Sequence, residues 1–198
     1  MKLDFLEIGT SNFRTLLETA DNNVIGISVE PLSYYLDQLP NFKNLIKENV
    51  AIAFDDIEKY IEIYYIPENI IEEQKLPEWL KGCNSLSNYH PKHIELGVTD
   101  LVKVERVLQV PISKLLEKYN VTSINFLKID TEGGDCDILL HFKNYLDTKD
   151  KTLYPKKIQF ETNFLTPKEK IESVLLLYKD LGYRQGKKKK TDTVLILN

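Results

Sequence analysis

The stretch from Phe126 to Asp135 places the strongest constraint on how this chain folds. Its first half is apolar apart from Lys128, as expected for a parallel strand that is buried on both faces. Its second half contains Asp130, Glu132 and two glycines, and a helical pattern begins at Cys136. In open α/β sheets, ligands bind just beyond the carboxyl ends of the strands. We therefore predict a functional site at Asp130 and Glu132.

The remainder of the chain alternates segments with strand and helix patterns. Strands are expected at residues 3–9, 24–30, 45–53, 59–66, 101–110, 124–130 and 157–161, helices at 13–19, 34–39, 112–119 and 168–181, and a closing hairpin at 183–185 and 193–197. Strands that alternate with helices form parallel sheets with right-handed crossovers. The sequence therefore predicts an α/β fold, with residues 1–198 as a single domain.

A long segment without a clear pattern, residues 67–97, interrupts this alternation. Long loops inside compact domains are usually lids or binding loops, so we expect this one to fold over the site, with a short helix at 77–81. His90 in this loop is an alternative proton acceptor, and Ser85 is expected to face the cofactor or the acceptor. A surface histidine and a loop-capping serine remain the alternatives.

Composition excludes several classes of protein. The net charge of -4 argues against general nucleic-acid binding, and we interpret residues 187–190, four consecutive lysines, as a solvated turn. No apolar run reaches the ~20 residues of a membrane span. The two cysteines, Cys83 and Cys136, form no disulfide framework. The N-terminus has no signal-peptide pattern, so we expect a cytoplasmic protein.

A second pair of residues points to a nucleoside ligand. Gly9 ends the first expected strand, and Glu30 ends the second, about 20 residues further on, where an acid can accept both ribose hydroxyls. The turn after Gly9 lacks the glycine-rich run that brings a backbone close to a pyrophosphate. A ligand with a ribose and no diphosphate, such as S-adenosylmethionine, fits better. A plain turn and a solvated glutamate are the alternative.

Several motifs together resemble the FkbM family of S-adenosylmethionine-dependent methyltransferases, over nearly the whole chain. Phe126–Gly133 is similar to the Leu-Lys-Ile-Asp-Val-Glu-Gly signature of that family. Glu7-Ile8-Gly9 resembles its first motif, Val29-Glu30-Pro31 its Phe-Glu-Pro motif, Asn49-Val50-Ala51-Ile52 its adenine-side strand, and Asn84-Ser85-Leu86 a Ser-Leu of its lid. Phe13 is a departure, because it replaces the last glycine of the usual Gly-Ala-Asn-x-Gly.

The resemblance implies a Rossmann-like class I methyltransferase sheet of about seven strands, mostly parallel with an antiparallel C-terminal hairpin strand. It also implies transfer of a methyl group from S-adenosylmethionine to a hydroxyl of a sugar or glycan, either a nucleotide-sugar or an oligosaccharide. An RNA ribose acceptor, supported by the lysine run alone, and an inactive cofactor-binding module remain alternatives. A nucleic-acid partner is not expected.

The site residues follow from these motifs and from the chemistry of methyl transfer to oxygen, which needs a positioned base. The catalytic candidates are Asp130, Glu132 and His90. The cofactor candidates are Glu7, Gly9, Thr10, Ser11, Glu30, Pro31, Asn49, Val50, Ala51 and Asp130, and the acceptor-side candidates are Ser85 and Glu161. A helix cap for Asp130 and a solvated strand end for Glu161 remain open. No metal ligands are predicted.

Lys128 is out of place in an apolar strand. A buried lysine needs a carboxylate partner or loses its charge. Asp130 on the same strand face and Glu7 on the neighbouring strand are the expected partners. We predict an ion pair that holds the carboxylates in place.

Overall fold

A seven-stranded sheet organises the computed structural model, which describes residues 1–13, 15–18, 20–86, 88–187 and 191–198. Its order is β3-β2-β1-β7-β8-β10-β9. The strands are β1 (Lys2–Ile8), β2 (Gly26–Val29), β3 (Leu45–Glu48), β7 (Ser123–Ile129), β8 (Lys157–Glu161), β9 (Tyr183–Gln185) and β10 (Asp192–Leu197). The first five strands of this order pair in parallel, and β10 is antiparallel to both β8 and β9. The predicted α/β sheet is confirmed.

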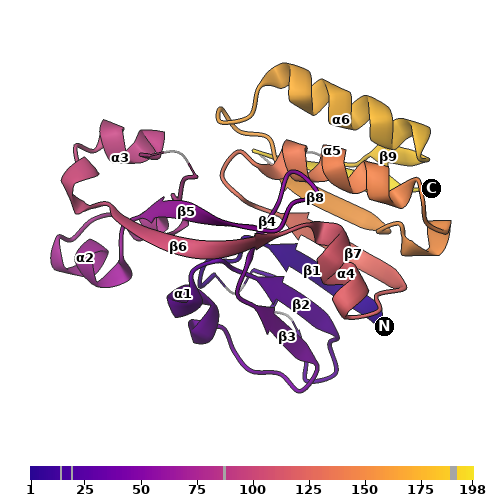
Figure 1. Cartoon of the computed structure of the whole chain (residues 1–198), viewed down its shortest axis with the longest axis horizontal. Helices are drawn as coiled ribbons and strands as arrows, with labels where there is room; N and C mark the ends of the chain where they lie inside the picture. Colours follow the sequence, from indigo (N-terminus) through magenta and orange to yellow (C-terminus); the bar gives the residue numbers. More distant parts are fainter. Residues whose placement is uncertain (14, 19, 87, 188–190) are drawn as a thin grey trace.

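Three helices cover one face of this sheet: α4 (Ile112–Lys118), α5 (Asp135–Leu146) and α6 (Lys168–Asp180). Their buried side chains, such as Phe142 and Tyr178, share one core cluster with Leu6 and Leu127 of the central strands. Figure 1 shows α5 and α6 lying side by side above the sheet. On the opposite face, α1 (Ser33–Gln38) and the residues after β1 bury Phe5.

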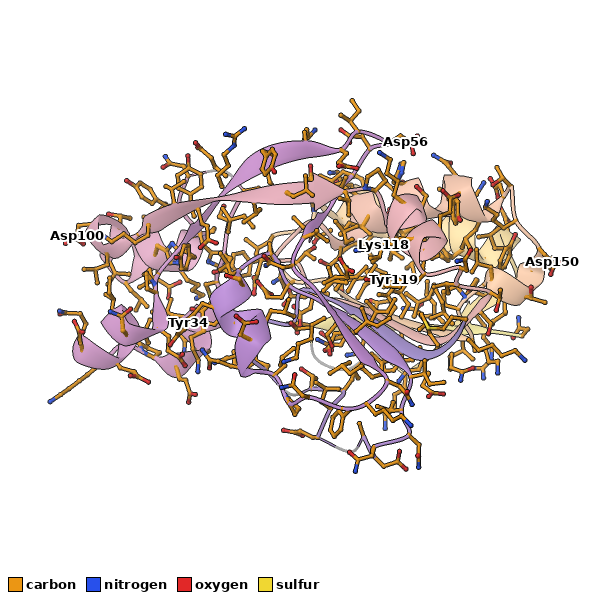
Figure 2. All side chains as sticks on the ribbon, turned by 60° about the horizontal axis from the view of Figure 1, so that its bottom comes forward. Tyr34, Asp56, Asp100, Lys118, Tyr119 and Asp150 are labelled. Carbon is orange, nitrogen blue, oxygen red and sulfur yellow. The ribbon has the colours of Figure 1, made fainter. Side chains whose placement is uncertain are left out.

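Glu48 anchors the edge of the sheet to α4. It accepts a hydrogen bond from Lys118 Nζ at 2.7 Å and another from the Tyr119 hydroxyl. Figure 2 shows Lys118 and Tyr119 next to each other at this position.

The helix predicted at residues 13–19 is wrong. Among the residues described there, 13 and 15–18 form turns and irregular backbone. The two polar residues before this segment, Ser11 and Asn12, bond to distant parts of the chain: Ser11 Oγ donates to the Lys81 carbonyl oxygen at 3.2 Å, and the Asn12 side chain donates to Gln38 at 2.8 Å.

The strand predicted at residues 45–53 is confirmed from Leu45 to Glu48, but it does not continue to Ala53, because it is broken at Asn49. The Asn49 side chain donates to the carbonyl oxygens of Glu30 at 3.0 Å and Pro31 at 2.9 Å, where the chain leaves the large sheet. After the break, β4 (Ala51–Ile52) pairs with β6 (Lys103–Val110), and β6 pairs with β5 (Lys59–Tyr65), in a second sheet of order β4-β6-β5. The strands predicted at 59–66 and 101–110 are therefore confirmed, in a separate sheet.

The segment 67–97 carries short helices at the far end of this second sheet (Figure 1): α2 (Glu68–Glu73), η1 (Glu78–Gly82) and α3 (Pro91–Glu95). The short helix predicted at 77–81 is confirmed as η1. Two further 3-10 turns, η2 (Thr99–Leu101) and η3 (Lys151–Leu153), complete the fold. Within the described part of the chain, no helix is long and apolar enough to cross a membrane. Of the lysine run, residues 188–190 lie outside the described residues.

Candidate active site

The strand order reverses between β1 and β7, and Gly9 lies at this point. Gly9 has a φ of +78°, and a Cβ there would lie 2.0 Å from the carbonyl oxygen of Asp130. Only glycine lets the turn after β1 approach the turn after β7 this closely. The crevice at such a reversal is the place where open α/β sheets bind ligands.

A pocket of about 540 Å³ opens here. It is lined by the ends of β1, β2 and β7, by β4, and by residues of the 67–97 segment. The predicted site residues that line it are Gly9, Thr10, Ser11, Glu30, Pro31, Val50, Ala51, Ser85, His90, Asp130 and Glu132. Glu7, Asn49 and Glu161 are not among the lining residues. A volume of this size is typical of a small-molecule site.

Glu30 connects the end of β2 to the turn after β1. Its Oε2 accepts the Ser11 amide at 2.7 Å, and its Oε1 accepts the Leu32 amide at 3.0 Å. The side chain is buried, and this burial raises the pKa of Glu30 to about 7 despite the two amide hydrogen bonds. A carboxylate oxygen has a second lone pair, so Glu30 can still accept hydrogen bonds from a ligand.

The ion pair predicted for Lys128 is confirmed with both partners. Lys128 Nζ lies 3.1 Å from Glu7 Oε1 and 3.1 Å from Asp130 Oδ2. Glu7 is 1% exposed, and burial raises its pKa although Lys128 opposes the shift. The neighbouring carboxylates raise the pKa of Lys128 against the effect of its burial. The lysine therefore remains charged and holds the Asp130 carboxylate at the pocket.

Glu132 and His90 join the signature turn to the 67–97 segment. Glu132 has a φ of +52°, a rare conformation for a residue with a side chain, and strain of this kind clusters at functional sites. Its Oε2 lies 3.3 Å from His90 Nε2. His90 Nδ1 accepts the Lys92 amide at 3.1 Å, which places the ring proton on Nε2, facing Glu132.

Glu161, at the end of β8, completes a group of three carboxylates with Asp130 and Glu132. One oxygen from each lies within 4.8 Å of the others. Glu161 Oε2 is buried and has no hydrogen-bond partner. Burial, followed by repulsion from Glu132 and Asp130, raises the pKa of Glu161 to about 8. Carboxylate oxygens also suit hard divalent cations, so this group is the place where a metal ion would fit.

Asp135 is a structural residue of the site to which the sequence analysis assigned no role. Its Oδ1 accepts the Thr131 amide at 2.8 Å and the Thr131 hydroxyl at 2.6 Å, and its Oδ2 accepts the Glu161 amide at 2.7 Å. Burial raises the pKa of Asp135 to about 6. One buried carboxylate thus holds the turn after β7 against the end of β8. The available signal was an acid directly before the predicted helix, where side-chain oxygens commonly accept hydrogen bonds from backbone amides.

The departure at Phe13 has a counterpart in the 67–97 segment. Phe13 lines the pocket, and a Cβ on Gly82 would lie 3.3 Å from the Phe13 ring. Ser11 Oγ donates to the carbonyl oxygen of Lys81 at 3.2 Å, next to this contact. A small residue in the segment therefore accommodates the larger residue in the turn.

This sheet order, with a pocket at the ends of β1, β2 and β7, defines the class I methyltransferase fold. The chain matches the family model of the Methyltransferase FkbM domain over residues 8–185, and it belongs to this family, whose cofactor is S-adenosylmethionine. No curated protein matches it. Two solved structures are similar to it. The delta-N METTL16 MTase domain is 11% identical over 99% of this chain and 71% of that chain, with a TM-score of 0.41. The human methyltransferase 10 domain containing protein is 13% identical over 100% of this chain and 72% of that chain, also with a TM-score of 0.41.

Proposed function

We propose that this protein is an S-adenosylmethionine-dependent O-methyltransferase that acts on a hydroxyl of a sugar or glycan. The observation that supports it best is the convergence of Gly9, Glu30 and Asp130, from three strand ends, on one pocket. We assign segment 67–97, several of whose residues line the pocket, as its lid. Both cysteines are buried and free, which supports a reducing location, the cytoplasm.

The residues around Gly9 fit the cofactor. S-adenosylmethionine supplies, when bound, a methyl group on a positively charged sulfur. We assign its ribose hydroxyls to Glu30 and its adenine to the apolar Val50 and Ala51. The amino-acid part is assigned to the turn from Gly9 to Ser11, which a side chain at Gly9 would displace. Glu7 and Asn49 contact this lining without belonging to it: Glu7 pairs with Lys128, and Asn49 donates to the Glu30 carbonyl oxygen.

Asp130 is the proposed base. Lys128 binds its Oδ2, and 42% of the Asp130 side chain is exposed, so Oδ1 is available to accept the proton of an acceptor hydroxyl. Orientation of the hydroxyl supplies much of the rate in such a transfer. Glu132 is the second carboxylate, and His90 positions it through Nε2. Ser85 and Glu161 are assigned to the acceptor side.

Calorimetry with S-adenosylmethionine and S-adenosylhomocysteine tests the cofactor assignment. If neither binds, the enzyme proposal is wrong and an inactive module is favoured. If both bind, Asp130→Asn should lower turnover by about 100-fold or more, the usual effect of removing a base, with affinity for S-adenosylhomocysteine changed by less than about threefold. If turnover and affinity for S-adenosylhomocysteine fall equally, Asp130 is a cofactor ligand or a structural group.

Asp100→Asn is the matched control for this experiment. Asp100 is exposed and lies at one end of the molecule (Figure 2). The same chemical change there should leave both turnover and affinity at the wild-type values. Methyl transfer itself is measured with labelled S-adenosylmethionine on a panel of glycans and short RNAs.

A further inference from the structure

Aromatic side chains line the pocket together with the carboxylates. Trp79 is 48% exposed, Tyr89 is 39% exposed and Phe54 is 37% exposed, and all three line the pocket. Exposed apolar side chains that share one site mark a binding surface. Flat rings suit the apolar face of a sugar ring, and they suit a nucleobase equally well. The aromatic residues alone do not separate a glycan from a nucleotide.

The charges of the pocket favour a glycan over a nucleotide. Its charged lining consists of Glu30, Asp130, Glu132, Asp137 and, as the one lysine or arginine among the described lining residues, Lys128. Glu7 and Asp130 already bind that lysine from two sides. Glu161 adds a further carboxyl group, with one oxygen within 4.8 Å of oxygens of Asp130 and Glu132.

The lysines near the pocket are also engaged. Lys170 Nζ lies 2.7 Å from Asp137, and Lys81 Nζ lies 3.0 Å from Glu68 and 2.9 Å from Glu78. Both ring nitrogens of His90 are engaged, because Nε2 lies 3.3 Å from Glu132 Oε2 and Nδ1 accepts the Lys92 amide hydrogen. Across the described residues of this pocket, no cation is left to bind a phosphate.

We propose that the acceptor end of this pocket selects an unphosphorylated saccharide, neutral or amine-bearing, and rejects nucleotide-sugars and RNA. The inference rests on the proposed function and narrows its substrate class. A phosphate brought next to Glu132 would meet like charge in a partly dehydrated site, where electrostatic repulsion is much stronger than in water. RNA acceptors carry a phosphate at each nucleotide, and proteins that bind them supply free lysines or arginines.

Matched acceptors test this selection. The panel contains hexoses and amino-hexoses as p-nitrophenyl glycosides, the same sugars as 6-phosphates and as nucleoside-diphosphate esters, neutral oligosaccharides and short RNAs. Transfer from labelled S-adenosylmethionine is measured in EDTA and in Mg²⁺. We expect kcat/KM for an unphosphorylated acceptor to exceed that of its phosphorylated partner at least tenfold in both buffers. We also expect the ratio to fall at high salt, which screens repulsion.

One substitution should lower the ratio of kcat/KM between an unphosphorylated acceptor and its phosphorylated partner. Asp137→Asn removes a negative charge from the pocket lining and releases Lys170, so we expect the preference against phosphate to fall at least threefold. Asp147→Asn is the matched control at the other end of α5. It releases Lys143 from its 2.6 Å ion pair, and Asp147 is not among the pocket-lining residues. It should leave the ratio unchanged.

The outcomes are distinct. Equal or better transfer to phosphorylated sugars, nucleotide-sugars or RNA, in either buffer, overturns this inference and leaves methyl transfer itself intact. An unchanged ratio in the Asp137 variant, or an equal change in the Asp147 variant, overturns its electrostatic basis. Transfer to no member of the panel contradicts the proposed function, and this inference falls with it.

Discussion

Replacing Lys128 by methionine should destabilise the protein strongly. Methionine keeps the length and apolar character of the side chain and removes the charge. Glu7, which is 1% exposed, then loses the cation that lies 3.1 Å away. Asp130 loses the same partner, but it is partly exposed and can be hydrated.

The magnitude follows from the burial of Glu7. Breaking a buried ion pair by removing one partner costs about 3–5 kcal/mol, because a charge is left without a counter-charge. For a domain of this size each kcal/mol lowers Tm by about 2–4 °C. We therefore expect Lys128→Met to lower Tm by roughly 6–20 °C. The pKa of Glu7, already raised, should rise further.

Thermal and urea unfolding measure this effect in four proteins: wild type, Lys128→Met, Glu7→Gln and the double variant. The double variant should recover much of the lost stability, because no buried charge is left without a partner and Asp130 can be hydrated. Lys114→Met is the matched control, since Lys114 pairs with the exposed Glu58 at 3.1 Å. It should stay within about 1 kcal/mol of wild type. A loss below about 1 kcal/mol in Lys128→Met, or a double variant as unstable as the sum of the single changes, would refute the reasoning.

Three further predictions concern the site. Gly9→Ala should abolish S-adenosylhomocysteine binding in calorimetry, because its Cβ would lie 2.0 Å from the Asp130 carbonyl oxygen; wild-type affinity would contradict this. The pKa of Glu30 is raised from 4.5 to about 7, so the folded protein holds a proton that the unfolded chain releases, and the free energy of unfolding should decrease as pH rises through this window. Urea unfolding from pH 5 to 8 should show a smaller decrease in Glu30→Gln, and parallel pH dependences in both proteins would exclude this role. Dialysis against EDTA should leave methyl transfer intact, because Lys128 supplies the cation at Asp130; a loss restored by Mg²⁺ would assign a metal ion to the three carboxylates instead.

Local pattern predicted most of the large sheet, because apolar periodicity and strand-end residues are properties of short segments. The strand before Asp130 and the helix after it are present as expected. The Lys128 ion pair was predictable for the same reason: a lysine in a buried strand needs a carboxylate, and Glu7 and Asp130 were the nearest in the expected sheet. Local pattern gave a wrong prediction for the helix at residues 13–19, where distant residues bind the segment. Just before it, the Ser11 amide donates a hydrogen bond to Glu30, 19 residues away.

The sequence by itself determined the class of fold, the family signature and the position of the carboxylates at the strand ends. Only the tertiary structure decided which of these groups meet. His90 and Glu132 are 42 residues apart, and the Glu161 carboxylate joins Asp130 and Glu132 from a neighbouring strand. Such contacts depend on how segments pack in three dimensions. The sequence indicated methyl transfer through its family signature. The acidic and aromatic pocket, which bears on the choice of acceptor, became visible only in the packed structure.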